Sequence, residues 1–88
     1  MEVKEKKQIT TEDITDVIRQ LILFNSNHLW EDVIIQLQKA TKYDIVHCEQ
    51  IATIAHTKGK ATVKTGTLNE LNLINSVLKE IHLITEII

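Results

Sequence analysis

The sequence predicts an all-α fold, a small four-helix domain that forms a homodimer through a long C-terminal helix. The 88 residues include no proline and only two glycines, which disfavours the tight turns of β-hairpins. Apolar residues recur at steps of three and four along most of the chain, as they do on the buried face of a helix. Residues suited to helix capping precede these periodic stretches. Together these observations favour helices over strands.

Composition and charge limit the size and class of the protein. The chain is 43% hydrophobic with a net charge of −2, which is typical of a globular domain. Residues 1–9 carry five charges and no periodicity, so we expect a flexible charged tail there. Residues 10–88 are then expected to form a single helical domain.

The first two predicted helices span residues 11–24 and 28–43. Thr10 and Asp13 resemble a capping box at the start of the first helix. The polar residues 25–27 interrupt the apolar pattern and supply caps for the second helix. Each helix therefore has a start signal and an apolar face.

A third helix is predicted over residues 45–57. Asp44 is suited to capping its start, and Gly59 is suited to ending it. Residues 60–66, with the sequence KATVKTG, are short and rich in Thr and Val. Their conformation stays open between an extended segment and an irregular turn.

The last predicted helix spans residues 68–88 and opens with a capping box formed by Thr67 and Glu70. Its apolar residues cover more than one face, so packing against the protomer core leaves a second apolar strip exposed. Such strips usually bind a partner. We expect self-association or protein binding through this strip, which comprises Leu73, Leu83, Ile84, Ile87 and Ile88.

Residues 47–66 support an alternative function. The sequence IATIAH, a glycine and KATVKTG resemble the support helix, turn and recognition helix of a helix-turn-helix. Residues 38–68 contain five lysines and two acids, a charge suited to duplex DNA. The alternative is a dimeric DNA-binding transcriptional regulator, and nine lysines against one arginine hint at a phage or plasmid origin. Its DNA contacts are expected from Lys58, Lys60, Thr62 and Lys64.

Catalytic and metal-binding patterns are weak in this sequence. His47, Cys48 and His56 lack the paired short spacings of a tetrahedral zinc site. Cys48 lies on the apolar side of its predicted helix, where a thiol serves as a small hydrophobe. Gly59 and Lys60 do not belong to a phosphate-binding loop, because Ala61 stands where Ser or Thr is needed. We therefore expect no enzyme activity, no cofactor and no metal.

The function predicted from sequence is that of a small non-enzymatic regulatory or adaptor protein that acts by binding proteins. No stretch of about 18 apolar residues is present, so we expect no membrane span. The start MEVKEKKQ is followed by no apolar block, so we expect no secretory signal and a cytoplasmic location.

Overall fold

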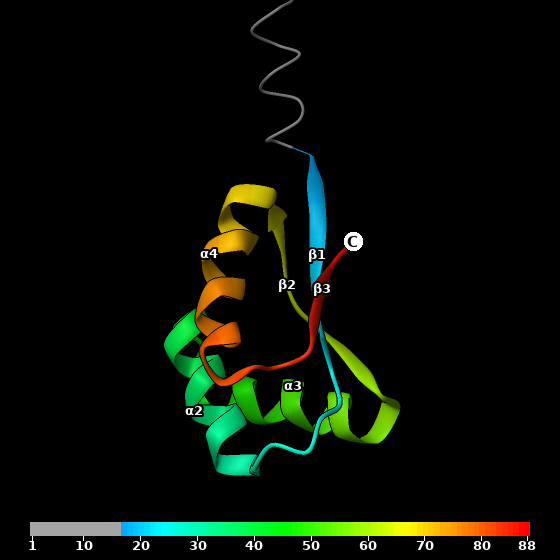
Figure 1. Ribbon diagram of the computed structural model, residues 1–88, viewed down its shortest axis with the longest axis vertical. Coiled ribbons are helices and arrows are strands. Elements are labelled where there is room, and N and C mark those ends of the chain that lie inside the picture. Colours follow the sequence, from blue (N-terminus) through cyan, green and yellow to red (C-terminus); the bar gives the residue numbers. More distant parts are fainter. Residues whose placement is uncertain (1–16) are drawn as a thin grey trace, which may run out of the picture.

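The computed structural model describes residues 17–88 and shows an α/β fold, so the all-α prediction is wrong. Three helices and a short 3-10 turn pack on one side of a three-stranded antiparallel sheet (Figure 1). The central strand β1 (Ile18–Phe24) is flanked by β2 (Lys60–Thr67) and β3 (Thr85–Ile87). The tail expected at residues 1–9 lies outside the described residues.

Strand β1 replaces the first predicted helix, and the part of that prediction before residue 17 lies outside the described residues. Leu21, Ile22 and Leu23 are all buried. Side chains of a strand alternate between its two faces, so Leu21 and Leu23 enter the core while Ile22 lies on the outer face. The helix prediction failed because the partners of β1 lie far along the chain and leave no local signal.

The second and third predicted helices are present as α2 (Trp30–Thr41) and α3 (Ile45–Lys58). Asp44 caps α3 by accepting a hydrogen bond from the backbone N–H of His47 at 2.9 Å. Gly59 ends α3 with a φ of 92°, a conformation that favours glycine. Local capping chemistry thus located α3 well. The caps expected from residues 25–27 are not used, because α2 starts after Leu29, which makes no side-chain capping hydrogen bond.

Strand β2 follows Gly59 directly and pairs with the whole of β1. The register shifts between Leu21, which pairs with Lys64, and Ile22, which pairs with Thr62. Val63 is therefore the additional residue of a β-bulge. The alternating apolar and polar residues of KATVKTG form this strand, which the sequence analysis left open.

The last predicted helix is wrong beyond its third turn. Helix α4 (Leu68–Leu78) opens with the expected capping box but gives way to the 3-10 turn η1 (Lys79–Ile81). His82 then adopts a φ of 62°, which turns the chain back towards β1. The C-terminal residues form β3 instead of two further helical turns, and no glycine or proline marks the change.

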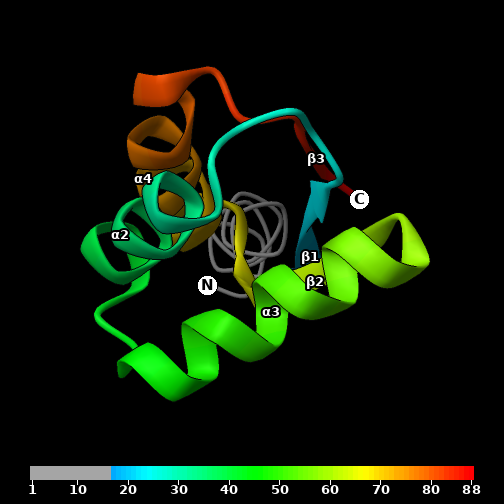
Figure 2. The same cartoon turned by 90° about the horizontal axis from the view of Figure 1, so that it is seen from below.

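The core lies between the helices and the inner face of the sheet (Figure 2). Its buried residues come from every helix, from β1 and β2, and from the segment before β3: Leu21, Leu23, Ile34, Leu37, Cys48, Ile51, Ala52, Ala55, Ala61, Val63, Leu71, Leu78 and Leu83. Within residues 17–88, no helix has the length and apolar character needed to cross a bilayer.

Helix α2 is also tied to the end of α4 by polar groups. The buried Gln36 side chain donates from Nε2 to the carbonyl of Val77 at 2.6 Å and to Oε1 of Glu80 at 3.0 Å. Lys39 forms an ion pair with the same carboxylate oxygen at 2.9 Å. Hydrogen bonds from Lys39 and Gln36 lower the pKa of Glu80. These contacts hold α2, which lines part of the pocket described next, against the end of α4.

Candidate functional site

A pocket of about 340 Å³ opens between the loop after β1 and the C-terminal half of α3. Ligand pockets commonly range from about 300 to 1,000 Å³, so this one lies at the small end. It is lined by residues 23–28, by the first turns of α2, by three residues of α3 and by Leu83. In Figure 2 the cyan loop after β1 runs beside the orange segment after α4, which brings Leu83 to the pocket.

The floor of the pocket is apolar. Leu23 and Leu83 are almost fully buried, and Val33 packs beside the core. Helix α3 contributes Ala52 and Ala55, whose side chains end at Cβ. Two small residues one turn apart leave space that a larger side chain in either place would occupy. The hollow is therefore a consequence of the alanines on this face of α3.

The rim of the pocket is polar and is held by hydrogen bonds. The backbone N–H of Asn25 donates to the carbonyl of Gly59 at 3.0 Å, which ties the loop to the end of α3. The backbone N–H of Ser26 donates to Oδ1 of Asn25 at 3.0 Å. The Ser26 hydroxyl bonds Nδ1 of His28 at 2.7 Å, and Nε2 of His28 bonds the carbonyl of Ile81. The loop is thus anchored to both neighbouring segments.

The mouth of the pocket carries an aromatic side chain and a second imidazole. Trp30, the only tryptophan of the chain, is 44% exposed. His56 on α3 is also exposed. None of the described residues that line the pocket carries a carboxylate. Glu31 and Asp32 lie in the first turn of α2 but do not line the pocket. The pocket combines an apolar floor with uncharged or imidazole hydrogen-bonding groups.

The predicted partner strip is split by the structure. Leu83 is fully buried in the core, and Ile87 is half-buried against it. Ile84 and Ile88 are more than half exposed on the outer side of the sheet, and Leu73 is exposed on α4. The five residues therefore do not share one surface, because the chain does not continue as a helix.

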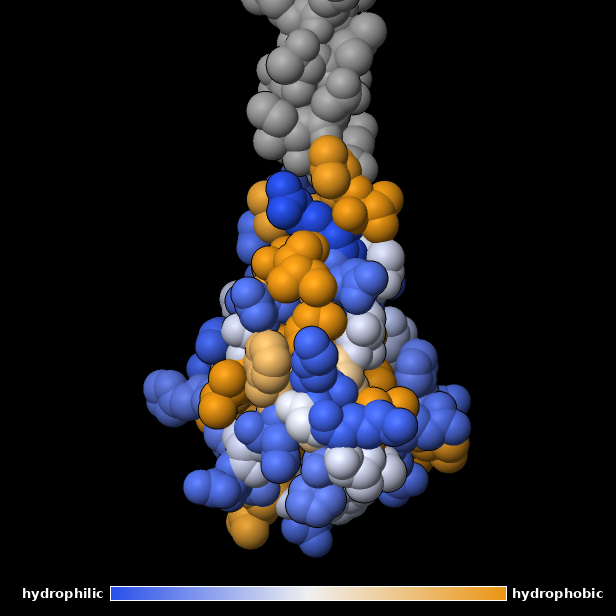
Figure 3. Space-filling view, turned by 90° about the vertical axis from the view of Figure 1, so that its right-hand side faces the viewer, coloured by the Kyte–Doolittle hydropathy of each residue, from blue (hydrophilic) through white to orange (hydrophobic). Residues whose placement is uncertain are grey.

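The outer face of the sheet carries an exposed apolar surface instead. Ile84 and Ile88 pair with β1 through backbone hydrogen bonds to Phe24 and Gln20. Ile18 at the start of β1 is 62% exposed. Figure 3 views this side and shows orange apolar residues along it, bordered by blue hydrophilic ones. We call Ile18, Ile84 and Ile88 the outer-sheet surface.

The residues predicted to contact DNA do not belong to a recognition helix. Lys58 ends α3, whereas Lys60, Thr62 and Lys64 lie in β2. A helix-turn-helix needs a helix after the turn, so the strand after Gly59 contradicts that interpretation. Because of the bulge, Lys64 pairs with the inward-facing Leu21 while Thr62 pairs with Ile22 on the outer face. The structure does not gather these side chains into one patch.

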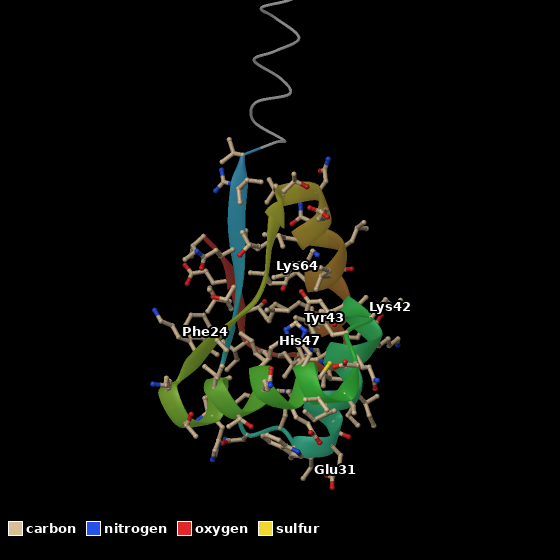
Figure 4. The ribbon with its side chains drawn as sticks, turned by 180° about the vertical axis from the view of Figure 1, so that it is seen from behind. Phe24, Glu31, Lys42, Tyr43, His47 and Lys64 are labelled. Atoms are coloured by element: carbon tan, nitrogen blue, oxygen red, sulfur yellow. The ribbon has the colours of Figure 1, made fainter. Side chains whose placement is uncertain are left out.

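The residues weighed as a metal or thiol site also have structural partners. The Tyr43 ring stacks on His47 with centroids 3.9 Å apart, and its hydroxyl donates to the carbonyl of Val63 at 3.2 Å (Figure 4). Cys48 is fully buried, and this burial raises the pKa of its thiol. Within residues 17–88, no three His, Cys, Asp or Glu side chains are grouped to hold a metal ion.

The pocket was not predicted from the sequence, although several of its residues were noted. From sequence, residues 25–27 indicate a break with helix caps, and His56 enters only as a candidate zinc ligand without the required spacing. A usable signal was the pair Ala52 and Ala55 on the apolar face of α3, followed at once by the polar His56. Small residues on a face that packs against a loop indicate a hollow.

Comparison with known proteins identifies the family of this chain. Residues 16–82 match the family model described as ATP-dependent Clp protease adaptor protein ClpS. A search of curated proteins found no match. The family is one of adaptors, not of proteases, and the match gives no support to DNA binding, to a homodimer or to a phage or plasmid origin. Since the matched range covers most of the 88 residues, including β1, β2 and all the described helices, this chain belongs to the ClpS family of protease adaptors.

Proposed function

We propose that this protein is a substrate adaptor that takes an apolar side chain of a protein substrate into the pocket and delivers the substrate to an ATP-dependent Clp protease. The observation that supports the proposal is the apolar hollow with a polar rim, which lies within the family match except for Leu83. The proposal includes the cytoplasmic location expected from the sequence, since an adaptor acts where its protease acts.

The lining favours a large uncharged side chain as the occupant. Leu23, Leu83 and the two alanines of α3 offer apolar contact but no partner for a buried charge. An unpaired charge is costly to bury, so acidic and basic side chains are disfavoured. Burying one large apolar side chain supplies about 1.5 to 3 kcal/mol. Hydrogen bonds from rim residues such as Asn25 and His56 to the backbone of the substrate supply specificity.

Trp30 offers a direct test of this proposal, because the single tryptophan lines the pocket. Peptides without tryptophan that differ only at one residue, Leu, Phe or Asp, are titrated while Trp30 fluorescence is recorded. We expect a saturable change with the Leu or Phe peptide and at least tenfold weaker binding of the Asp peptide, about 1.4 kcal/mol. Equal responses to all three peptides, or none, are incompatible with an apolar substrate pocket.

An adaptor must hold its protease as well as its substrate, so it needs a second contact. We assign that contact to the outer-sheet surface, which includes the exposed members of the predicted strip near the chain end, Ile84 and Ile88. The surface lies on the side of the sheet away from the helices (Figure 1), whereas the pocket is lined by the alanines of α3. An apolar surface that no other part of residues 17–88 covers is typical of a protein contact.

The variant Ile88→Glu tests the second contact. A charge in the middle of an apolar interface is expected to weaken binding to the Clp protease by at least tenfold, measured by surface plasmon resonance. Peptide binding reported by Trp30 should be unchanged. Leu73→Glu is the matched control, because Leu73 is 73% exposed on α4 rather than on the sheet. A protease affinity that Ile88→Glu leaves unaltered contradicts the assignment, and a variant that changes only the mass of the assembly in solution points to self-association.

A further inference from the structure

His28 connects the pocket rim to the segment after α4. Its Nδ1 bonds the Ser26 hydroxyl at 2.7 Å, and its Nε2 bonds the backbone carbonyl of Ile81. Both Ser26 and His28 line the pocket, and both are half-buried. The imidazole is therefore fixed on both sides, and one of its partners is a group that an occupant can reach.

The partners of His28 decide which ring nitrogen carries the proton. A carbonyl oxygen only accepts hydrogen bonds, so Nε2 must donate to Ile81. In a neutral imidazole the other nitrogen, Nδ1, is then an acceptor, and the Ser26 hydroxyl must donate its proton to it. The remaining lone pairs of the Ser26 oxygen can only accept a hydrogen bond from whatever enters the pocket.

Protonation of His28 reverses this arrangement. Both nitrogens of an imidazolium are donors, so Nδ1–H then donates to the Ser26 oxygen. The Ser26 O–H then no longer bonds Nδ1, so it can donate a hydrogen bond to an occupant. An imidazole is the side chain that ordinarily gains its proton between about pH 5 and 8, so the experiment below covers this range.

We infer that His28 is a specificity-determining residue that sets the hydrogen-bonding direction of Ser26 in the pocket. With His28 neutral, the pocket selects a segment that presents an N–H donor next to its apolar side chain. With His28 protonated, Nδ1–H occupies one of the two lone pairs of the Ser26 oxygen and the freed O–H becomes a competing donor, so Ser26 is a poorer acceptor for that N–H. The inference rests on the proposed function, because it concerns the occupant of the same pocket.

Other charged groups near His28 have to be separated from its effect. Helix α3 contributes His56 to the same pocket, and the first turn of α2 carries Glu31 and Asp32. Around Ile81, η1 carries Lys79 and Glu80 and is followed by His82. Lys79 donates to the carbonyl of Leu83, and Glu80 is held by Lys39 and Gln36. Of all these groups, His56 is the other imidazole that lines the pocket.

The test is a series of Trp30 titrations between about pH 5.5 and 7.5 with the apolar peptide that binds best. Weakening of this hydrogen bond is expected to lower the affinity about three- to tenfold at the acid end for an amide donor, and more for a charged amine. The peptide is used with a free and with an acetylated N-terminus. A pH response only with the free terminus identifies an amine as the donor, whereas a response with both identifies a backbone amide.

Three variants separate the sources of the pH response. His28→Gln and Ser26→Ala should each remove it, and His56→Gln should retain it. Ser26→Ala keeps the inference testable if His28→Gln is poorly folded, which thermal unfolding will show. A response that survives in Ser26→Ala, or that disappears in His56→Gln, overturns the inference while leaving the proposed function intact. No peptide binding at any pH overturns both.

A second measurement does not depend on any peptide. The ¹⁵N chemical shifts of histidine ring nitrogens distinguish the two neutral tautomers. We expect the His28 ring of the free protein to carry its proton on Nε2 at about pH 7.5. A proton on Nδ1 contradicts the assigned direction of the Ser26 hydrogen bond and overturns the inference even if peptides bind.

Discussion

The variant Leu83→Ala is expected to lose about 2 to 5 kcal/mol of unfolding free energy. Leu83 is fully buried and packs in the core beneath the loop after β1. Truncation removes its apolar contacts and leaves a cavity that the surrounding strands and helices fill only in part. Urea denaturation followed by circular dichroism measures the loss.

The neighbouring variant Ile84→Ala is the matched control. Ile84 is 51% exposed on the outer side of the sheet, so its truncation should change the unfolding free energy by no more than about 0.5 kcal/mol. The helix predicted over residues 68–88 does not give this large difference, because it places Leu83 and Ile84 together in the exposed strip. The relative cost of two adjacent truncations therefore distinguishes the two folds.

The variant Ala55→Leu is expected to weaken binding of an apolar peptide at least tenfold, about 1.4 kcal/mol. Ala55 lines the pocket on α3, and three additional carbon atoms at this place compete with the occupant for the same space. The Trp30 titration used for the wild-type protein measures the affinity. Unfolding free energy is measured in parallel, since Ala55 is buried and overpacking costs about 1 to 3 kcal/mol.

Thr53→Leu separates the filled pocket from a general effect of an added leucine on α3. Thr53 is an exposed residue of the same helix and does not line this pocket. Its variant should bind the peptide as the wild-type protein does. If both variants lose affinity equally, or if Ala55→Leu binds normally while folded, the peptide does not occupy the hollow beside α3.

The parts of the fold that sequence predicted well are those determined by local chemistry. Asp44 and Gly59 delimit α3, and the Thr67–Glu70 capping box starts α4, as their side chains and backbone preferences indicate. Each of these signals depends on residues within one helical turn. They can therefore be identified without knowledge of the rest of the structure.

The strands were missed because their stabilisation comes from distant residues. Leu21, Ile22 and Leu23 are buried mainly by β2, β3, α3 and α4, all of which come at least 20 residues later in the chain. At the chain end, His82 adopts a left-handed conformation without being glycine or asparagine. The spacing of Ile81, Ile84 and Ile88 is also compatible with a helix. The C-terminal segment forms a strand instead because it pairs with β1.

The candidate site was predicted only in outline. A protein-binding adaptor was expected, but the contact was assigned to the chain end because exposed apolar residues are visible in a sequence and hollows are not. The pocket joins Ala55, Ser26 and Leu83, which come from three separate segments. No spacing along the chain indicates that these residues meet.

The attachment of the last segment has a consequence for local stability. Strand β3 has three residues and lies at the sheet edge, and it pairs with β1 alone. Short edge strands open at lower free energy than the core, as native-state hydrogen exchange commonly reveals. When β3 detaches, Leu83 and the carbonyl of Ile81 are no longer held against the pocket. Opening of β3 is therefore expected to disturb the pocket at a lower free energy than unfolding of α2, α3 or the paired strands β1 and β2.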